Sequence, residues 1–243
     1  MTEMRELHVY DCALMGVQTT RLVLVAMLIA GGLAATCVSS AGNAVADPQT
    51  CPPVCDQIPD TAWMSSSAIP LNSTYHWPSL AGSAVSMTGT ATPRFRFEEV
   101  CATPVSPHDT RDSAVAARAT VENAGANWQL RAQVLHWRGD TARGGQDASS
   151  VLSIAAAALR GCQLGSAAES PSVTVDEPNR LAAVISGPVI MHTYLVAHPE
   201  NSSLSELTMW ATDPVQLAWP IMSDAQVLDA MTSPVCAAYL GSC

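Results

Sequence analysis

Residues 172–212 read SVTVDEPNRLAAVISGPVIMHTYLVAHPENSSLSELTMWAT and decide the fold class. Short runs rich in valine, isoleucine, leucine and threonine recur in this stretch, which is typical of β-strands. They predict three or four strands, at Ser172–Val175, Leu181–Ser186, Val189–Ala197 and Leu204–Thr212. The loop 198–203 joins the last two runs, and no helical pattern separates any of the four, so we expect antiparallel neighbours.

Two further pairs of strands are predicted upstream of this stretch. Apolar and polar residues alternate over 85–90 and again over 94–98, with a turn at Thr92-Pro93 between them. A second alternation covers 115–122 and 128–134 and contains a glycine in its connecting loop, which is typical of a hairpin. The alanine-rich first arm of this hairpin also fits a helix, and that alternative stays open.

Helical spacing occurs at two places in the chain. One apolar stripe follows a predicted loop at 139–146, with Asp147, Ser149 or Ser150 as its cap and Gly161 at its end. The members of this stripe are Val151, Ile154, Ala155, Ala158, Leu159 and Cys162. Ser223 to Gln226 form a capping box before a final helix, and Ser233-Pro234 is predicted to begin another turn.

The order of these elements contains no alternation of strand, helix and strand. It therefore predicts an α+β fold: a single mostly antiparallel sheet with two or three helices packed on one face and stapled by disulfides. Residues 81–243 form this domain. Residues 47–80 carry six prolines among buried-type side chains, and we expect an extended proline-rich arm that packs on the body.

The N-terminal residues 1–46 are predicted to be a secretory signal peptide. An apolar stretch, 22–33, follows Arg21, and Ala44-Val45-Ala46 before Asp47 matches a signal-peptidase site, with cleavage between Ala46 and Asp47. Acidic residues before Arg21 fit poorly, so the true start is expected at Met15. A lipoprotein and an uncleaved anchor remain alternatives, and in the latter case the presequence is the expected membrane contact.

Six cysteines follow the predicted cleavage site: Cys51, Cys55, Cys101, Cys162, Cys236 and Cys243. An even number in an exported chain predicts disulfides, three of them if all six pair. The prolines between Cys51 and Cys55 favour an extended backbone, which disfavours a bond between these two. The connectivity stays open. A metal site is disfavoured by the spacing, and we expect neither a metal nor another cofactor.

Composition narrows the function classes. The 243 residues carry a net charge of −10, and all 11 basic residues are arginine. A nucleic-acid surface needs clustered positive charge, so nucleic acid is not an expected partner. Arginine without lysine, together with alanine runs, indicates a high-GC coding sequence, and we hypothesise an actinobacterial source. The predicted location is outside the cytoplasm, either secreted or in the cell envelope.

The residues of the chain match no catalytic motif that we recognise, and we assign no catalytic residue. His136 and His192 fall in predicted strands, where core or surface roles are expected. His108-Asp109 with Asp112 is either a metal or acid–base site or, as we favour, a solvated loop. Five side chains are candidates for an apolar pocket, although ordinary core positions are the alternative: Trp128, Trp137, Met191, Met209 and Trp210.

A family resemblance covers roughly residues 60–243. Four segments carry the resemblance: AVADP (44–48), Trp77-Pro78, Arg160-Gly161-Cys162 and the tail VLDAMTSPVCAAYLGSC (227–243). The third of these precedes the run of predicted strands. This arrangement resembles the extracellular sensor domains of mycobacterial PknH-type serine/threonine kinases and the secreted domains similar to them. The resemblance implies a ligand-binding fold with a cleft between sheet and helix.

We therefore hypothesise a secreted, non-enzymatic binding or sensor-like domain. Its expected ligand is a small amphiphile, a glycan or an envelope component. The alternative is an envelope or host-interface module that binds another protein, and the third reading is a secreted hydrolase of unfamiliar type. Exposed tryptophans in the arm 47–80 would favour the second reading, and His, Asp and Ser side chains converging in a pocket would favour the third.

Overall fold

The computed structural model describes residues 56–87, 92–107, 109–123 and 127–239. The predicted signal peptide with its Ala46-Asp47 cleavage site, and the cysteines Cys51, Cys55 and Cys243, lie outside these ranges. Within them, no helix combines the length and the apolar character that crossing a membrane requires.

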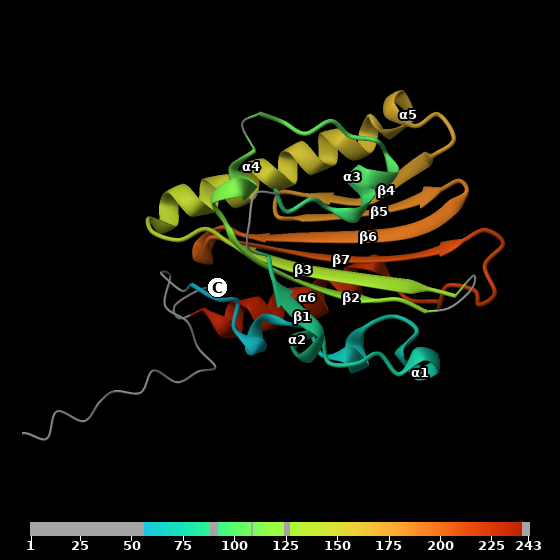
Figure 1. Cartoon of the computed structure of the whole chain (residues 1–243), viewed down its shortest axis with the longest axis horizontal. Helices are drawn as coiled ribbons and strands as arrows, with labels where there is room; N and C mark the ends of the chain where they lie inside the picture. Colours follow the sequence, from blue (N-terminus) through green and yellow to red (C-terminus); the bar gives the residue numbers. More distant parts are fainter. Residues whose placement is uncertain (1–55, 88–91, 108, 124–126, 240–243) are drawn as a thin grey trace, which may run out of the picture. The chain divides into compact units, whose positions relative to one another are not determined.

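The described chain builds one seven-stranded sheet in the order β1-β2-β3-β7-β6-β5-β4, shown in Figure 1. Every neighbouring pair is antiparallel. The strands are β1 Ala84–Ser86, β2 Val115–Val121, β3 Gln129–His136, β4 Ser170–Glu177, β5 Arg180–Ser186, β6 Val189–His198 and β7 Ser203–Thr212. The α+β prediction is thereby confirmed. Predicted strands within 172–212 match β4 to β7, and the alanine-rich 115–121 segment is a strand rather than a helix.

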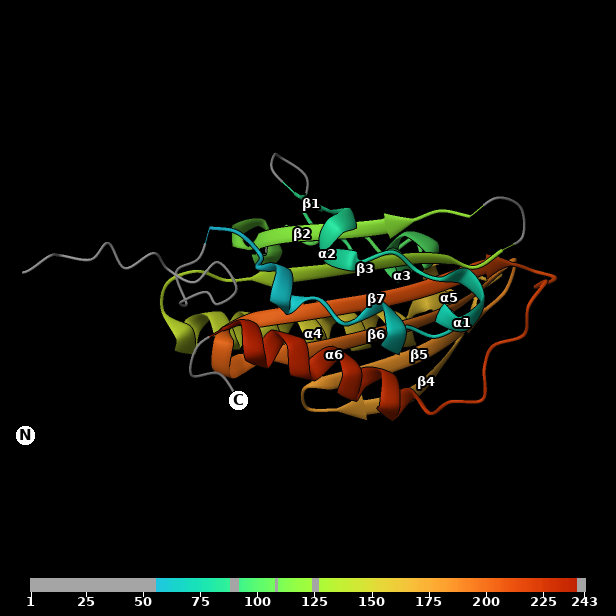
Figure 2. The same ribbon diagram turned by 90° about the horizontal axis from the view of Figure 1, so that it is seen from below.

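Helices cover both faces of the sheet, whereas the sequence predicted helices on one face. The helices α3 (Arg96–Val100), α4 (Thr141–Arg160) and α5 (Cys162–Gly165) lie on one side, and α6 (Asp224–Ala238) lies on the other (Figures 1 and 2). Two separate hydrophobic clusters result, one on each face. Strands such as β6 are therefore buried on both sides, which explains their nearly continuous apolar sequence.

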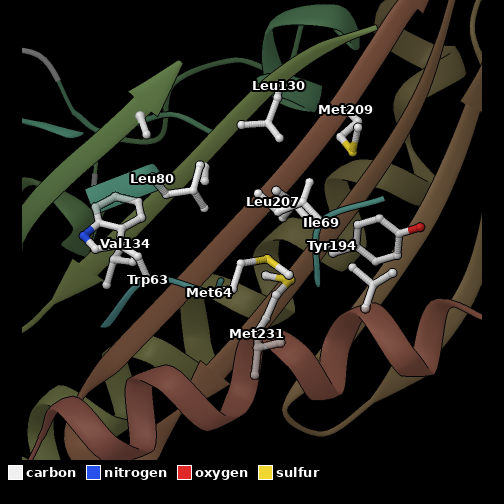
Figure 3. Packing of buried hydrophobic residues seen from close by; sticks show 14 of the residues in the cluster. Trp63, Met64, Ile69, Leu80, Leu130, Val134, Tyr194, Leu207, Met209 and Met231 are labelled. Carbon is white, nitrogen blue, oxygen red and sulfur yellow. The ribbon is translucent and has the colours of Figure 1, made fainter. Parts of the chain in front are cut away.

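Residues 56–83 share the second face with α6. They are not an extended arm: they form short helical turns, η1 (Asp60–Ala62), η2 (Ser66–Ala68), α1 (Asn72–Tyr75) and α2 (Leu80–Ser83). Their apolar side chains enter the same cluster as those of the sheet, and Figure 3 shows Trp63, Ile69 and Leu80 in this cluster together with Leu207. The Trp77 indole donates to the Pro70 carbonyl over 2.8 Å. Burial of these side chains makes the segment part of the folded body.

The long helix α4 begins earlier than predicted. Its N-cap is Asp140, whose side chain accepts a hydrogen bond from the Arg143 amide, so the predicted loop at 139–146 is largely helical. Gly144 and Gly145, which indicated a loop, lie within the helix. Glycine is needed at both positions because a Cβ at either would collide with the turn η4 (Pro199–Asn201) or with Ser202 after it. The predicted C-terminal cap at Gly161 is confirmed.

The predicted strand at 94–98 is wrong. Phe95 precedes α3 and Phe97 lies within it, and both rings are buried although they are two residues apart. The helical turn forms because the Glu98 carboxylate folds back and accepts the Phe95 amide over 2.8 Å. An alternating pattern of so few residues does not distinguish a strand from one turn of helix.

The C-terminal helix α6 starts at the predicted Ser223 capping box, which is confirmed. It then continues through Pro234 to Ala238 as one helix, so the turn predicted to begin at Ser233-Pro234 is helical but belongs to α6 rather than to a new helix. Val235 and Ala238 beyond the proline are fully buried. This packing offsets the hydrogen bond that a proline cannot donate.

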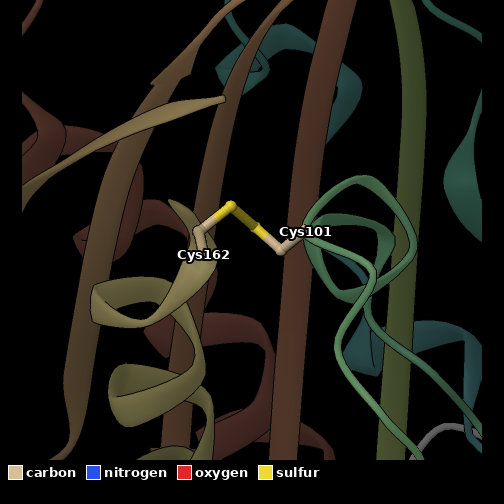
Figure 4. The surroundings of a disulfide bond; sticks show 2 residues. All are labelled: Cys101 and Cys162. Carbon is tan, nitrogen blue, oxygen red and sulfur yellow. A yellow bond between two sulfur atoms is a disulfide. The ribbon is translucent and has the colours of Figure 1, made fainter. Parts of the chain in front are cut away.

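A disulfide joins two of the six candidate cysteines and links the end of α3 to the start of α5. Cys101 and Cys162 are bonded, as Figure 4 shows, and both are buried. Cys236 is disulfide-bonded as well, and its partner lies outside the described residues.

Candidate binding cleft

The five residues predicted to form an apolar pocket do not come together. Trp128 and Met209 belong to the cluster on the α6 side of the sheet, whereas Trp137 and Met191 belong to the cluster on the α4 side. Trp210 packs on the latter, where the Arg96 guanidinium lies 4.9 Å from its ring centre. The sheet separates the two groups, so these residues are core rather than the lining of one site.

The histidines of the sheet are core residues too. His136 lies opposite Ser203 in the β3–β7 register, and its Nδ1 is 3.0 Å from the Ser203 hydroxyl. The Tyr239 ring stacks on His136 at 4.5 Å. All three side chains are buried, and none of them lines a hollow described below. A serine–histidine pair sealed in this way has no room for a substrate.

His192 lies on the α6 side of the sheet and stacks on Trp219 with ring centres 3.7 Å apart. Burial lowers the pKa of His192 to about 4, although Asp224 opposes the shift. Burial likewise lowers the pKa of His198 to about 4. Both imidazoles are therefore neutral at pH 7. In the described ranges, no three His, Cys, Asp or Glu side chains are grouped as a metal site requires.

The helix α4 packs directly against the sheet over much of its length. Val151, Leu152, Ala155 and Leu159 share one buried cluster with residues of β5, β6 and β7. The resemblance implied a cleft between sheet and helix. One hollow of about 320 Å³ lies between α4 and the β4–β5 hairpin, with Leu152, Asp176 and Leu181 in its lining, but its charged side chains Arg160 and Asp176 are about half exposed. Further hollows lie where α4 meets other segments of the chain.

One of these hollows combines an apolar wall with buried charge, and we call it the α3–α4 cleft. It lies between α4 and the segment that runs from α3 to the turn η3 (Thr110–Ser113). Its cavity measures about 50 Å³, enough for roughly three or four water-sized groups. The lining residues are Phe95, Glu98, Thr103, Pro104, Ser106, Asp109, Thr110, Arg111, Ser150, Val151, Ile154 and Ala155.

The floor of the α3–α4 cleft is an arginine held between two carboxylates. Arg111 donates to both oxygens of Glu98, over 2.8 and 2.9 Å. Its Nε also donates to Asp109 at 2.9 Å, and its guanidinium lies 4.7 Å from the centre of the Phe95 ring. The side chains of Arg111, Glu98 and Asp109 are 5–7% exposed. These contacts hold the three charged groups in fixed positions relative to one another.

The electrostatics of this floor keep Asp109 and Arg111 charged. Burial by itself would raise the pKa of Asp109, but hydrogen bonds from Arg111 and its positive charge lower that pKa below its ordinary value. Burial opposes the charge on Arg111 as well, and its pKa is nevertheless raised because it donates to Asp109 and Glu98. The floor is therefore a fixed, polar surface at any pH near neutrality.

The rim of the α3–α4 cleft is apolar and exposed. Ile154 points from α4 with half of its surface exposed, and Val105, between the lining residues Pro104 and Ser106, is 59% exposed. Exposed aliphatic side chains beside a hollow indicate a surface that gains from being covered. Other hollows near α4 lack this combination. The hollow beside Thr141 and Glu200 has about 630 Å³ and is wide open, and the hollow beside Trp137 and Arg143 has about 330 Å³ and polar walls.

Sequence reasoning identified only part of this site. Asp109 was singled out with His108 and Asp112, but as part of a solvated loop; its carboxylate is in fact buried against Arg111. Asp112 is exposed, and His108 lies outside the described residues. Glu98 and Glu99 diverge from one helical turn, Glu98 toward Arg111 and Glu99 toward Arg131. The missed signal was Arg111 itself, a cation within the acidic loop Asp109–Asp112.

The chain matches no protein-family model, no curated protein and no solved structure. The function must therefore be argued from the residues and their geometry.

Proposed function

We propose that this chain is an exported, non-enzymatic binding domain, sensor-like in character, whose α3–α4 cleft takes one end of a small amphiphile. The observation that carries the proposal is the pairing of an exposed apolar rim with a buried charged floor in one hollow. Binding pockets are typically lined by apolar groups with a few fixed polar groups that orient the ligand.

The size of the cleft limits what it holds. Its cavity of about 50 Å³ accommodates the end group of a ligand, while the remainder lies along Val105 and Ile154 on the rim. Arg111 uses its donors on Glu98 and Asp109, so a free anion gains little there. We therefore infer a ligand that inserts one hydroxyl-bearing edge of an uncharged head group, such as one side of a sugar ring, and whose tail is aliphatic.

Export supports the same reading. The predicted signal peptide, the net charge of −10 and the buried Cys101–Cys162 disulfide fit a protein of the envelope or the extracellular medium. The ligand of such a protein is an envelope component or a molecule met outside the cell.

Titration with octyl glucoside tests the proposal, because this probe joins an aliphatic tail to an uncharged sugar. The protein is purified from cells that export it and titrated while backbone NMR shifts are recorded. Shifts are expected at residues 103–111 and 150–155. Ile154→Ser should weaken binding about five- to tenfold, since it removes an aliphatic side chain that the tail covers.

Leu164→Ser is the matched control, because Leu164 is an exposed aliphatic residue on α5 outside the lining of the cleft. It should change the affinity by less than about twofold. Equal weakening by both substitutions, or shifts spread over the whole surface, would show unspecific adsorption and overturn the proposal. Octanoate and octylamine at the same concentrations report on the head group.

The described residues provide no support for either alternative function, the protein-binding module or the secreted hydrolase. Trp63 and Trp77 of the 56–83 segment are buried, so they offer no surface for a protein partner. The His136–Ser203 pair that a hydrolase would use is sealed within the sheet.

A further inference from the structure

A buried glutamate lies under α3, the helix that forms one wall of the α3–α4 cleft. Glu206 is in the central strand β7, on the same face of the sheet as α3, and is 2% exposed. Its Oε1 accepts the backbone amide of Arg96, the first residue of α3, over 2.8 Å. This bond ties α3 to the middle of the sheet.

The rest of the Glu206 carboxyl is incompletely satisfied. Oε1 also accepts the Thr208 hydroxyl over 3.0 Å, and Thr208 in turn shares a 2.9 Å hydrogen bond with Thr193. Oε2 has no hydrogen-bond partner among the described residues, and neither has the amide nitrogen of Gln133 on β3, which lies opposite Glu206 in the register. Burial of a carboxyl group with one oxygen unpartnered favours the neutral, protonated form over the carboxylate.

Three elements supply the groups that act on Glu206. Arg118 of β2 and Arg131 of β3 attract the carboxylate by their charge, whereas Arg96 of α3 contacts it through its backbone amide. The Arg96 guanidinium pairs with Glu99 instead. The described contacts include no ion pair between Glu206 and either of the other two guanidiniums, because Arg118 donates to Gln133 and Arg131 pairs with Glu99. Their charges attract the carboxylate from a distance without replacing its lost hydration.

We propose that Glu206 makes the docking of α3 pH-dependent: α3 stays closed on the sheet while Glu206 is protonated and opens more readily once Glu206 ionises. Opening lets water reach the carboxylate, which removes the cost of a buried charge. The consequence for binding rests on the proposed function: the cleft, whose floor includes Glu98 of α3, should hold its ligand more tightly at acidic pH.

The direction follows from linkage. Burial raises the pKa of Glu206 to about 7 against an ordinary 4.5, although Arg96, Arg131, Arg118 and Thr208 all lower it. The closed state therefore keeps its proton up to a higher pH than an opened state in water. Opening is correspondingly easier as the pH rises through this range, and an increase of about tenfold or more in the opening equilibrium is expected between pH 5.5 and 8.

Hydrogen exchange measured by mass spectrometry at pH 5.5 and pH 8.0 tests the proposal, with rates corrected for the intrinsic effect of pH. Peptides covering 94–103 should open about tenfold more at pH 8.0, while peptides covering β6 serve as the internal reference. In Glu206→Gln, which is neutral at both pH values and nearly the same size, that pH effect should disappear.

Glu169→Gln is the matched control. Glu169 is another buried glutamate with a raised pKa, but it lies at the start of β4, away from α3. This variant should keep the full pH effect at 94–103. The proposal is overturned if the wild-type protein shows no extra opening at pH 8.0, or if the effect persists in Glu206→Gln.

Titration of octyl glucoside at the same two pH values separates this proposal from the one on which it builds. Tighter binding at pH 5.5 in the wild-type protein, lost in Glu206→Gln, supports both. If no probe binds at either pH while exchange at 94–103 still depends on Glu206, the binding proposal fails and the pH-dependent docking of α3 stands. If octyl glucoside binds with equal affinity at both pH values, the proposed coupling between ligand binding and the docking of α3 is contradicted.

Discussion

At the scale of single residues, Arg111 organises the candidate cleft. Its guanidinium binds Glu98 and Asp109 together and lies over the Phe95 ring, so three side chains depend on one cation. Glu98 simultaneously accepts the Phe95 amide and thereby forms the first turn of α3. Removing the cation would take the close ion pair from both buried carboxylates and leave Glu98 with Arg94, 3.8 Å away.

Arg111→Ala should lower the free energy of unfolding by about 3–5 kcal/mol, the usual cost of breaking a buried ion pair from one side. Urea denaturation at pH 7 measures the change. Arg138→Ala is the control, because the Arg138–Asp56 pair is exposed and should contribute less than about 1 kcal/mol. Similar losses in both variants would show that the buried cluster has no special role in stability.

At the scale of elements, the position of α4 depends on two glycines. A Cβ on Gly145 would lie 2.4 Å from the Pro199 carbonyl, and a Cβ on Gly144 would lie 2.5 Å from Ser202. The helix therefore approaches the β6–β7 connection more closely than any residue with a side chain permits. This approach sets the height of α4 over the sheet and, with it, the position of Val151 and Ile154 in the cleft.

Gly145→Ala should destabilise the protein by about 1–3 kcal/mol, because the collision with backbone outweighs the gain in helix propensity. Thermal unfolding followed by circular dichroism provides the measurement. Gly82→Ala in α2 is the matched control: its Cβ would meet its nearest neighbour at 3.8 Å, an ordinary contact, so stability should hold or rise slightly. A neutral Gly145→Ala would mean that α4 and η4 separate freely.

At the scale of the whole molecule, stability should depend on pH through three buried groups. The pKa values of His192 and His198 are lowered to about 4 from 6.5, so stability falls as the pH drops from 6.5 and the unfolded chain takes up protons. The pKa of Glu206 is raised to about 7 from 4.5. The stability that it contributes is full below pH 4.5 and is lost as the pH rises to 7.

Two histidines outweigh one glutamate between pH 4.5 and about 7, so the free energy of unfolding should rise over this range and level off near pH 7, where the two contributions cancel. Urea denaturation at half-unit steps from pH 4 to 8 locates the plateau. In Glu206→Gln the rise between pH 4.5 and 7 should steepen, by up to about 1.4 kcal/mol per pH unit, because the opposing contribution of the glutamate is removed. An identical profile in the variant would contradict a raised pKa of Glu206 in the folded protein.

The local sequence pattern predicted those helices and strands whose apolar periodicity extends over many residues or whose cap residues are typical. The four strands within 172–212, the 115–134 hairpin and the capping box at Ser223 follow from periodicity and cap chemistry, which depend on neighbours in the chain. The candidate cleft was largely invisible to this reasoning. In its floor Glu98 pairs with Arg111, and Ile154 lines the same cleft. These residues are far apart in the chain, and no rule of sequence spacing predicts that they meet.

By itself the sequence determined the α+β class, the antiparallel neighbours and the pairing potential of its cysteines, because each depends on residue type and short-range order. The tertiary structure decided that helices cover both faces, that Phe95 and Phe97 border a helical turn, and that Gly144 and Gly145 are helical. These outcomes depend on what packs against each segment. A short segment or a glycine pair adopts whichever backbone its distant neighbours stabilise, and that free energy is not encoded in local order.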